Sequence, residues 1–86
     1  MPAIVIYTKS YCPYCHAAKD LLEKKGAPFQ EIDVTRDPDG FKAMVARAGG
    51  RTSVPQIFVG DAHVGGSDDL YALEARGRLD GLLAAA

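Results

Sequence analysis

The stretch KSYCPYCHAAKDLL (residues 9–22) places two cysteines where an apolar run gives way to a helical pattern. The run before it, AIVIYT (residues 3–8), is short and rich in β-branched residues, which is typical of a strand covered on both faces. From Pro13 onward, small and apolar residues recur at helical spacing, and Gly26 is a natural stop. The stretch therefore predicts a strand that leads directly into a helix, with C-P-Y-C at the junction.

The same two patterns alternate farther along the chain. PFQEIDV (residues 28–34) alternates apolar and polar residues, which predicts a strand with one more exposed face. Pro38 suits the first turn of a second helix, which is expected to end at Gly49-Gly50. QIFVG (residues 56–60) follows and predicts a third strand.

The last third of the chain predicts a hairpin and a final helix. GDAH (residues 60–63) fits a tight turn into a short fourth strand. Ser67 or Asp68 is expected to cap the helical segment that follows, because short polar side chains can bond the free amides of a first turn. Two glycines, Gly77 and Gly81, are expected to interrupt that helix before a short apolar tail.

This order, β-α-β-α-β-β-α, predicts one domain spanning residues 1–86. A β-α-β unit places its two strands parallel, with a right-handed crossover, and the hairpin adds two antiparallel strands. The predicted fold class is therefore α/β, with a mixed four-stranded sheet and helices on both faces.

Composition describes an ordinary globular chain. Of 86 residues, 48% are apolar and 24% are charged, and the formal net charge is −1. The charges are mixed, so no basic stripe indicates binding to nucleic acid or to a membrane surface. The apolar runs are too short to span a membrane, and the first ten residues do not resemble a signal peptide. We expect a cytoplasmic protein, and a monomer, because no oligomer interface is evident.

The two cysteines lie three residues apart, which leaves several possible roles. A disulfide that closes so short a loop adds little stability, so a structural staple is a poor explanation. C-P-Y-C-H also fits haem attachment, but this would require export and a large apolar cradle. A zinc site would need two more ligands, and His16 and His63 are the only histidines. We therefore expect a redox dithiol and no metal.

The position of the dithiol assigns a role to each cysteine. Cys12 is expected at the N-cap of the helix, exposed, beside free backbone amides and the Lys9 ammonium group, all of which favour a reactive thiolate. Cys15 lies one helical turn further on the same face and is expected to be more buried and to stay a thiol. These positions predict that Cys12 attacks a substrate disulfide and that Cys15 resolves the mixed disulfide.

Three motifs together resemble the signatures of dithiol glutaredoxins: Y-T-K-x-x-C-P-Y-C (residues 7–15), S-V-P (residues 53–55) and G-G-S-D-D (residues 65–69). The resemblance implies a thioredoxin-like fold and a glutathione-dependent disulfide oxidoreductase, with no tightly bound cofactor. Glutathione is the implied co-substrate. The implied protein substrates are mainly protein–glutathione mixed disulfides, with some protein disulfides such as that of ribonucleotide reductase.

The resemblance also implies a glutathione site. It implies a cis peptide bond between Val54 and Pro55, a turn that leaves the Val54 backbone free to pair with the cysteine segment of glutathione. Asp68 is expected to meet the α-amino group of the γ-glutamyl end, and Lys42, with Arg47 as the alternative, the glycine carboxylate. The residues expected to bind glutathione are Lys9, Tyr14, Lys42, Ser53, Val54, Pro55, Gly66, Ser67 and Asp68.

The chain departs from the family pattern at a few positions. Ser53 stands where threonine is common, and Ser67 replaces a cysteine of many relatives. Gly49-Gly50 can lengthen the loop before Arg51 and reshape the carboxylate end of the site. Two alternatives stay open, namely an electron donor reduced by thioredoxin reductase and a non-catalytic module that carries glutathione or an iron–sulfur cluster.

Overall fold

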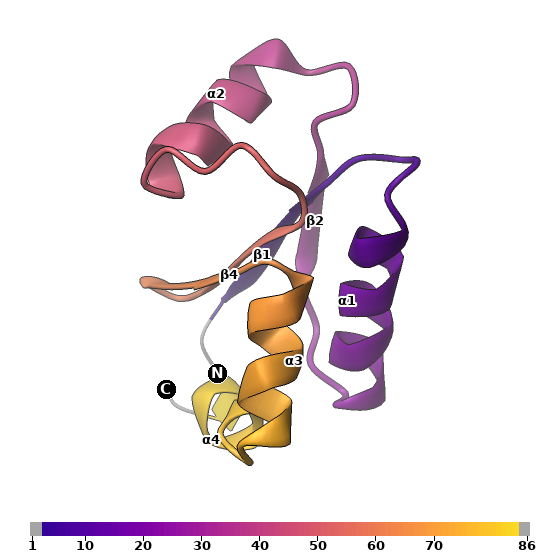
Figure 1. Cartoon of the computed structure of the whole chain (residues 1–86), viewed down its shortest axis with the longest axis vertical. Helices are drawn as coiled ribbons and strands as arrows, with labels where there is room; N and C mark the ends of the chain where they lie inside the picture. Colours follow the sequence, from indigo (N-terminus) through magenta and orange to yellow (C-terminus); the bar gives the residue numbers. More distant parts are fainter. Residues whose placement is uncertain (1–2, 85–86) are drawn as a thin grey trace.

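A computed structural model describes residues 3–84 and shows a four-stranded sheet with helices on both sides (Figure 1). The predicted order of seven elements is confirmed, and one helix follows them. The elements are β1 (Ile4–Thr8), α1 (Pro13–Lys24), β2 (Gln30–Asp33), α2 (Pro38–Arg47), β3 (Gln56–Val59), β4 (Ala62–Gly65), α3 (Ser67–Ala75) and α4 (Leu79–Ala84). The predicted domain bounds, 1 and 86, lie outside the described residues.

The sheet has the strand order β2-β1-β3-β4. β1 pairs in parallel with β2, as expected for a β-α-β unit, and antiparallel with β3, which pairs antiparallel with β4. The mixed sheet predicted from the sequence is thus confirmed. Its parallel and antiparallel pairs meet at β1, the strand that leads into the two cysteines.

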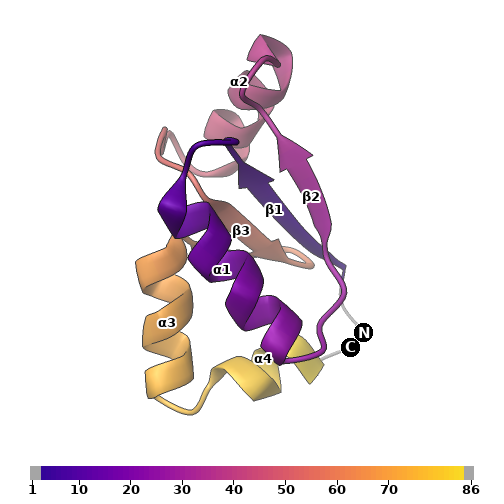
Figure 2. The same ribbon diagram turned by 90° about the vertical axis from the view of Figure 1, so that its right-hand side faces the viewer.

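The core has two halves because side chains alternate across the central strands. Ile4, Ile6 and Ile57 point toward α1, α3 and α4, whereas Tyr7 and Phe58 point toward α2. Figure 1 shows α2 on one side of the sheet and the other helices on the opposite side, and in Figure 2 α1 and α3 lie side by side. The apolar character of β1 on both faces follows from this arrangement.

The segment after Gly77 differs from the prediction of an apolar tail. Gly77 has φ +68 and ends α3, but a further helix, α4, follows and includes Gly81. Leu79 and Leu83, four residues apart, are both buried against the core, and this burial offsets the low helix propensity of glycine. Lys25, just after α1, also holds Asp80 through a 2.8 Å ion pair.

No helix within residues 3–84 combines the length and the apolar character needed to cross a membrane.

Candidate functional site

Cys12 occupies the N-cap position of α1, and Pro13 begins the helix, as predicted. The Cys12 sulfur accepts a hydrogen bond from the Cys15 amide at 3.2 Å, and as a thiol it donates to the Val54 carbonyl at 3.6 Å. The prediction that Cys12 is exposed is wrong, because only 8% of the residue is accessible. The loop that carries Val54 lies against the Cys12 sulfur and contributes to this burial.

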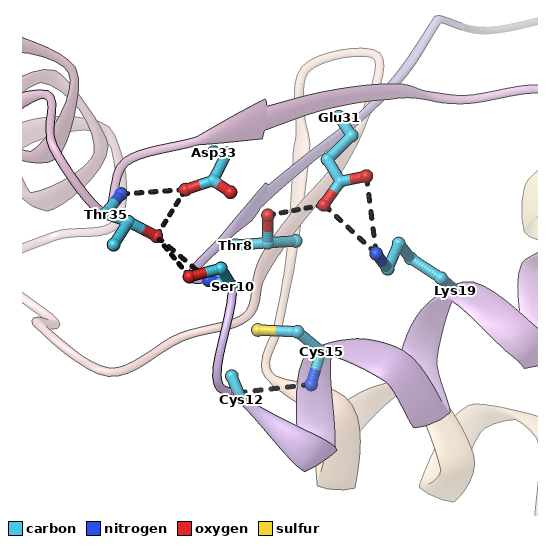
Figure 3. A network of polar contacts seen from close by, with 8 residues as sticks. All are labelled: Thr8, Ser10, Cys12, Cys15, Lys19, Glu31, Asp33 and Thr35. Atoms are coloured by element: carbon cyan, nitrogen blue, oxygen red, sulfur yellow. Dashed lines mark hydrogen bonds and ion pairs between the residues drawn. The ribbon is translucent and has the colours of Figure 1, made fainter.

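Cys15 lies deeper, with 1% of the residue accessible, which confirms the predicted difference between the two cysteines. Burial, and next the hydrogen bond with Cys12, raise the pKa of the Cys15 thiol to about 12. The Lys9 backbone amide and the charge of Lys19 act in the opposite direction. In Figure 3 the Cys15 side chain extends from α1 toward the end of β1. Cys15 is therefore a protonated thiol in the resting protein.

The loop opposite Cys12 has the predicted geometry, with a cis peptide bond between Val54 and Pro55. Gln56, which is fully buried, holds the start of this loop. Its amide nitrogen donates to the carbonyl oxygen of Ser53 at 2.9 Å and to its hydroxyl at 3.2 Å. Its amide oxygen lies 2.7 Å from His63 Nε2 on β4. The residue before Val54 is thus held in place by a buried side chain.

A groove of about 170 Å³ runs beside this loop toward the start of α3, and we call it the Val54 groove. It gathers most of the residues that the sequence predicted for glutathione, from three separate parts of the chain. The lining residues are Tyr14, Arg51, Ser53, Val54, Pro55, Gly66, Ser67, Asp68 and Asp69.

Lys9, Lys42 and Arg47 are not among the lining residues of the Val54 groove. The Lys9 ammonium nitrogen lies 4.9 Å from the centre of the Phe41 ring, and the Arg47 guanidinium lies 4.1 Å from the centre of the Phe58 ring. Lys42 is exposed on α2. Two of the three cations are thus held against aromatic rings, and the roles given to Lys9 and Lys42 stay predictions.

Arg51 and Asp69 line the groove but were not among the predicted residues. Asp69 Oδ2 accepts from the Gly66 amide at 2.9 Å and forms a 3.2 Å ion pair with Arg51. The N-cap of α3 is therefore Gly66, and the prediction of Ser67 or Asp68 is wrong, because the carboxylate of Asp69 reaches back to the Gly66 amide. A carboxylate three residues after an N-cap is half of a capping box, so this spacing was the available signal.

In this segment, position 65 accepts only glycine. Its φ is +110, and a Cβ atom there would lie 2.8 Å from an Arg51 guanidinium nitrogen and would collide with the Asp69 carboxylate. The hydrogen bond from the Gly66 amide is the main cause that lowers the pKa of Asp69, and Arg51 adds to it. This end of the groove is thus closely packed and charged, with free amides of α3 beside it.

Within residues 3–84, no three His, Cys, Asp or Glu side chains lie close enough together to hold a metal ion. His16 is exposed on α1, while His63 faces Gln56 from β4.

Comparisons with known proteins agree with this geometry. A family model described as Glutaredoxin matches residues 4–64. A glutaredoxin of Pseudomonas aeruginosa is 55% identical over 85 residues, covering 99% of this chain and 100% of that protein. Glutaredoxin 3 of Escherichia coli K12 is 54% identical over 83 residues, covering 96% of this chain and 99% of that protein. The crystal structure of a buckwheat glutaredoxin–glutathione complex superimposes with a TM-score of 0.85 at 32% identity, covering 95% of this chain and 76% of that chain. The predicted thioredoxin-like fold is confirmed.

Proposed function

We propose glutathione-dependent disulfide exchange at Cys12 for this chain, which belongs to the glutaredoxin family, a family of glutathione-dependent thiol oxidoreductases. The Cys12 thiolate attacks the glutathione sulfur of a protein–glutathione mixed disulfide, and the protein leaves as a thiolate that takes up a proton. A second glutathione thiolate then attacks the glutathione sulfur bound to Cys12. Oxidised glutathione leaves, and the Cys12 thiolate is restored.

One observation supports this proposal most directly, namely that the Val54 groove extends to the start of α3 and is lined by Val54, whose carbonyl oxygen lies 3.6 Å from the Cys12 sulfur. A tripeptide joined to Cys12 can pair with the Val54 backbone as a short added strand. Its γ-glutamyl carboxylate then meets the amides and positive dipole end of α3, near Ser67, while its α-amino group meets Asp68. In this proposal the carboxylate and the α-amino group of the γ-glutamyl residue each face a group of opposite charge or dipole.

The other predicted contacts complete the proposed site. Tyr14, Ser53, Pro55 and Gly66 line the walls against which the glutathione backbone lies. We retain Lys42, with Arg47 as the alternative, as the contact for the glycine carboxylate, and Lys9 as a cation beside Cys12, although none of these three residues lines the Val54 groove. The buckwheat glutaredoxin complex with glutathione supports a site for the same ligand in this fold.

Reduction of protein disulfides requires the second cysteine. Cys12 attacks the protein disulfide and forms a mixed disulfide with one of its sulfurs. Cys15 then loses its proton and attacks the Cys12 sulfur, so that the reduced protein leaves and a Cys12–Cys15 disulfide remains. Two glutathione molecules restore the dithiol and become oxidised glutathione. A cytoplasmic location is part of this proposal, because the glutathione pool there keeps such thiols reduced.

A coupled assay tests the proposal and its main alternative. The substrate is the mixed disulfide of glutathione and 2-mercaptoethanol, and the electron source is either glutathione with its reductase or thioredoxin reductase, each with NADPH. We expect turnover with glutathione, and none in Cys12→Ser. Turnover with thioredoxin reductase alone would favour the alternative electron donor, and full activity in Cys12→Ser would refute attack by Cys12.

A further inference from the structure

A short polar chain lies between α1 and the sheet, close to Cys15 (Figure 3). Thr8, at the end of β1, is 1% accessible, and its hydroxyl donates to Glu31 Oε2 at 2.6 Å. The Lys19 ammonium group on α1 donates to both oxygens of the Glu31 carboxylate, at 3.1 and 3.3 Å. The carboxylate is therefore fixed on one side by a neutral donor and on the other by a cation.

Lys19 follows Cys15 by four residues, which places both side chains on the same face of α1. Figure 3 shows both extending from α1 toward the sheet strands that carry Thr8 and Glu31. The Lys19 charge favours the Cys15 thiolate, as does the Lys9 backbone amide. Farther along β2, Asp33 accepts two hydrogen bonds from Thr35 and is engaged there.

The influences on Cys15 change when Cys12 enters a mixed disulfide. In the resting protein, Cys12 opposes ionisation of Cys15 through their hydrogen bond and through its charge. A disulfide sulfur carries no charge and no proton, so both effects are lost. Burial of Cys15 still opposes the thiolate, while Lys19 and the Lys9 amide still favour it. The balance between burial and these two favourable groups decides how readily Cys15 can attack.

We propose that Lys19 and Glu31 form a positioning pair that sets the rate of the resolving step, with Lys19 stabilising the Cys15 thiolate and Glu31 limiting that effect. In this step the Cys15 thiol releases its proton and its sulfur bonds to Cys12. The bond between Cys12 and the substrate sulfur breaks, and the departing thiolate takes up a proton. The two cysteines are oxidised by two electrons and the substrate disulfide is reduced. The inference rests on the proposed function and concerns only the attack by Cys15.

The pair makes a prediction that a purely structural ion pair does not. Lys19→Gln removes the cation that favours the Cys15 thiolate and should disfavour that thiolate, whereas Glu31→Gln leaves the Lys19 ammonium group without its counter-ion and should favour it. A thiol attacking well below its pKa changes in rate by about threefold per pKa unit, because thiolate fraction and nucleophilicity partly offset each other. We expect resolution about threefold slower in the first variant and about threefold faster in the second. If the pair were only a structural tie, both variants would shift resolution in the same direction.

Stopped-flow reaction of the reduced protein with 5,5′-dithiobis(2-nitrobenzoate) separates the two attacks. Each attack releases one coloured thiolate, first when Cys12 forms the mixed disulfide and then when Cys15 resolves it. Cys15→Ser identifies the second phase by its loss. Lys24→Gln removes an exposed cation from the same helix and serves as the matched control, with both phases expected at wild-type rates. Lys19→Arg keeps the charge and should keep the second phase at the wild-type rate.

The ratio of the second rate to the first, measured from pH 6 to 9, decides the matter. Displacement of this ratio in opposite directions by Lys19→Gln and Glu31→Gln supports the inference. Displacement in the same direction, or none in either variant, overturns it. A wild-type protein without a first phase would instead refute attack by Cys12, and with it the proposed function on which the inference rests.

Discussion

The Cys12 sulfur lies 3.6 Å from the Val54 carbonyl oxygen, although 42 positions separate the two residues. This contact places the attacking atom of the proposed reaction against a residue that lines the Val54 groove. It also accounts in part for the burial of Cys12, of which 8% is accessible. A ligand that enters the groove and pairs with the Val54 backbone is brought to the sulfur, so binding and reaction are coupled by geometry.

Cys15→Ser is expected to separate the two proposed activities. Its reduction of a glutathione mixed disulfide should continue, because glutathione itself can attack the Cys12 adduct. Its reduction of a protein disulfide, measured with insulin, should be lost. Retention of insulin reduction at the wild-type rate would show that Cys15 is not the resolving thiol.

Asp68→Asn should weaken binding of glutathione without preventing the chemistry at Cys12. Loss of the charge that faces the α-amino group should raise KM for the glutathione mixed disulfide by about threefold to tenfold, while kcat changes little. Asp39→Asn is the matched control, since Asp39 is also an exposed aspartate in the first turn of a helix, α2, but does not line the groove. Equal KM values for Asp68→Asn and wild type would remove Asp68 from the proposed site.

Gly65→Ala should destabilise the fold and disturb the groove together. The positive φ alone costs about 1–2 kcal/mol for a residue with a Cβ atom, and here that atom also meets Arg51 and Asp69. Gly26→Ala also has positive φ, at +65, but nothing lies within 4 Å of the new atom. Denaturant unfolding should therefore show a larger loss for Gly65→Ala, because its φ of +110 is less accessible to alanine than +65 and its Cβ atom also meets neighbours. Equal losses in the free energy of unfolding would show that the collision is relieved without cost.

Asp69 should contribute a stability that depends on pH. The Gly66 amide, and then Arg51, lower its pKa in the folded state below the ordinary value of 3.8, so the folded protein favours the charged carboxylate. Because the folded pKa is the lower one, this stabilisation is present above the unfolded pKa and is lost as pH falls through the folded pKa.

The difference in unfolding free energy between wild type and Asp69→Asn should therefore be largest near neutral pH and shrink below about pH 4. Asp68→Asn is the control variant, because the Asp68 carboxylate does not accept a hydrogen bond from the Gly66 amide. A difference that stays constant from pH 7 to pH 3 would contradict the proposed linkage.

The sequence alone predicted seven of the elements and the positions of the two cysteines at the start of α1. A continuous apolar run, alternating and helical patterns and turn residues predicted the seven elements from β1 to α3, because strands, helices and turns constrain residues close together in the chain. C-P-Y-C at a strand–helix junction predicted Cys12 at the N-cap and Cys15 behind it, since both positions follow from local geometry. The last helix, α4, was not predicted, because it depends on Leu79 and Leu83 packing into a core made by residues far away in the sequence.

The tertiary structure decided which distant groups meet. It buried Cys12 under the Val54 loop, paired Arg51 with Asp69, and placed Lys9 and Arg47 against aromatic rings. A long cationic side chain can reach several partners of similar energy, so its choice depends on which surfaces the fold places nearby. The polar chain of Thr8, Glu31 and Lys19 arises in the same way, from two strands and a helix whose separate sequences give no sign of one another.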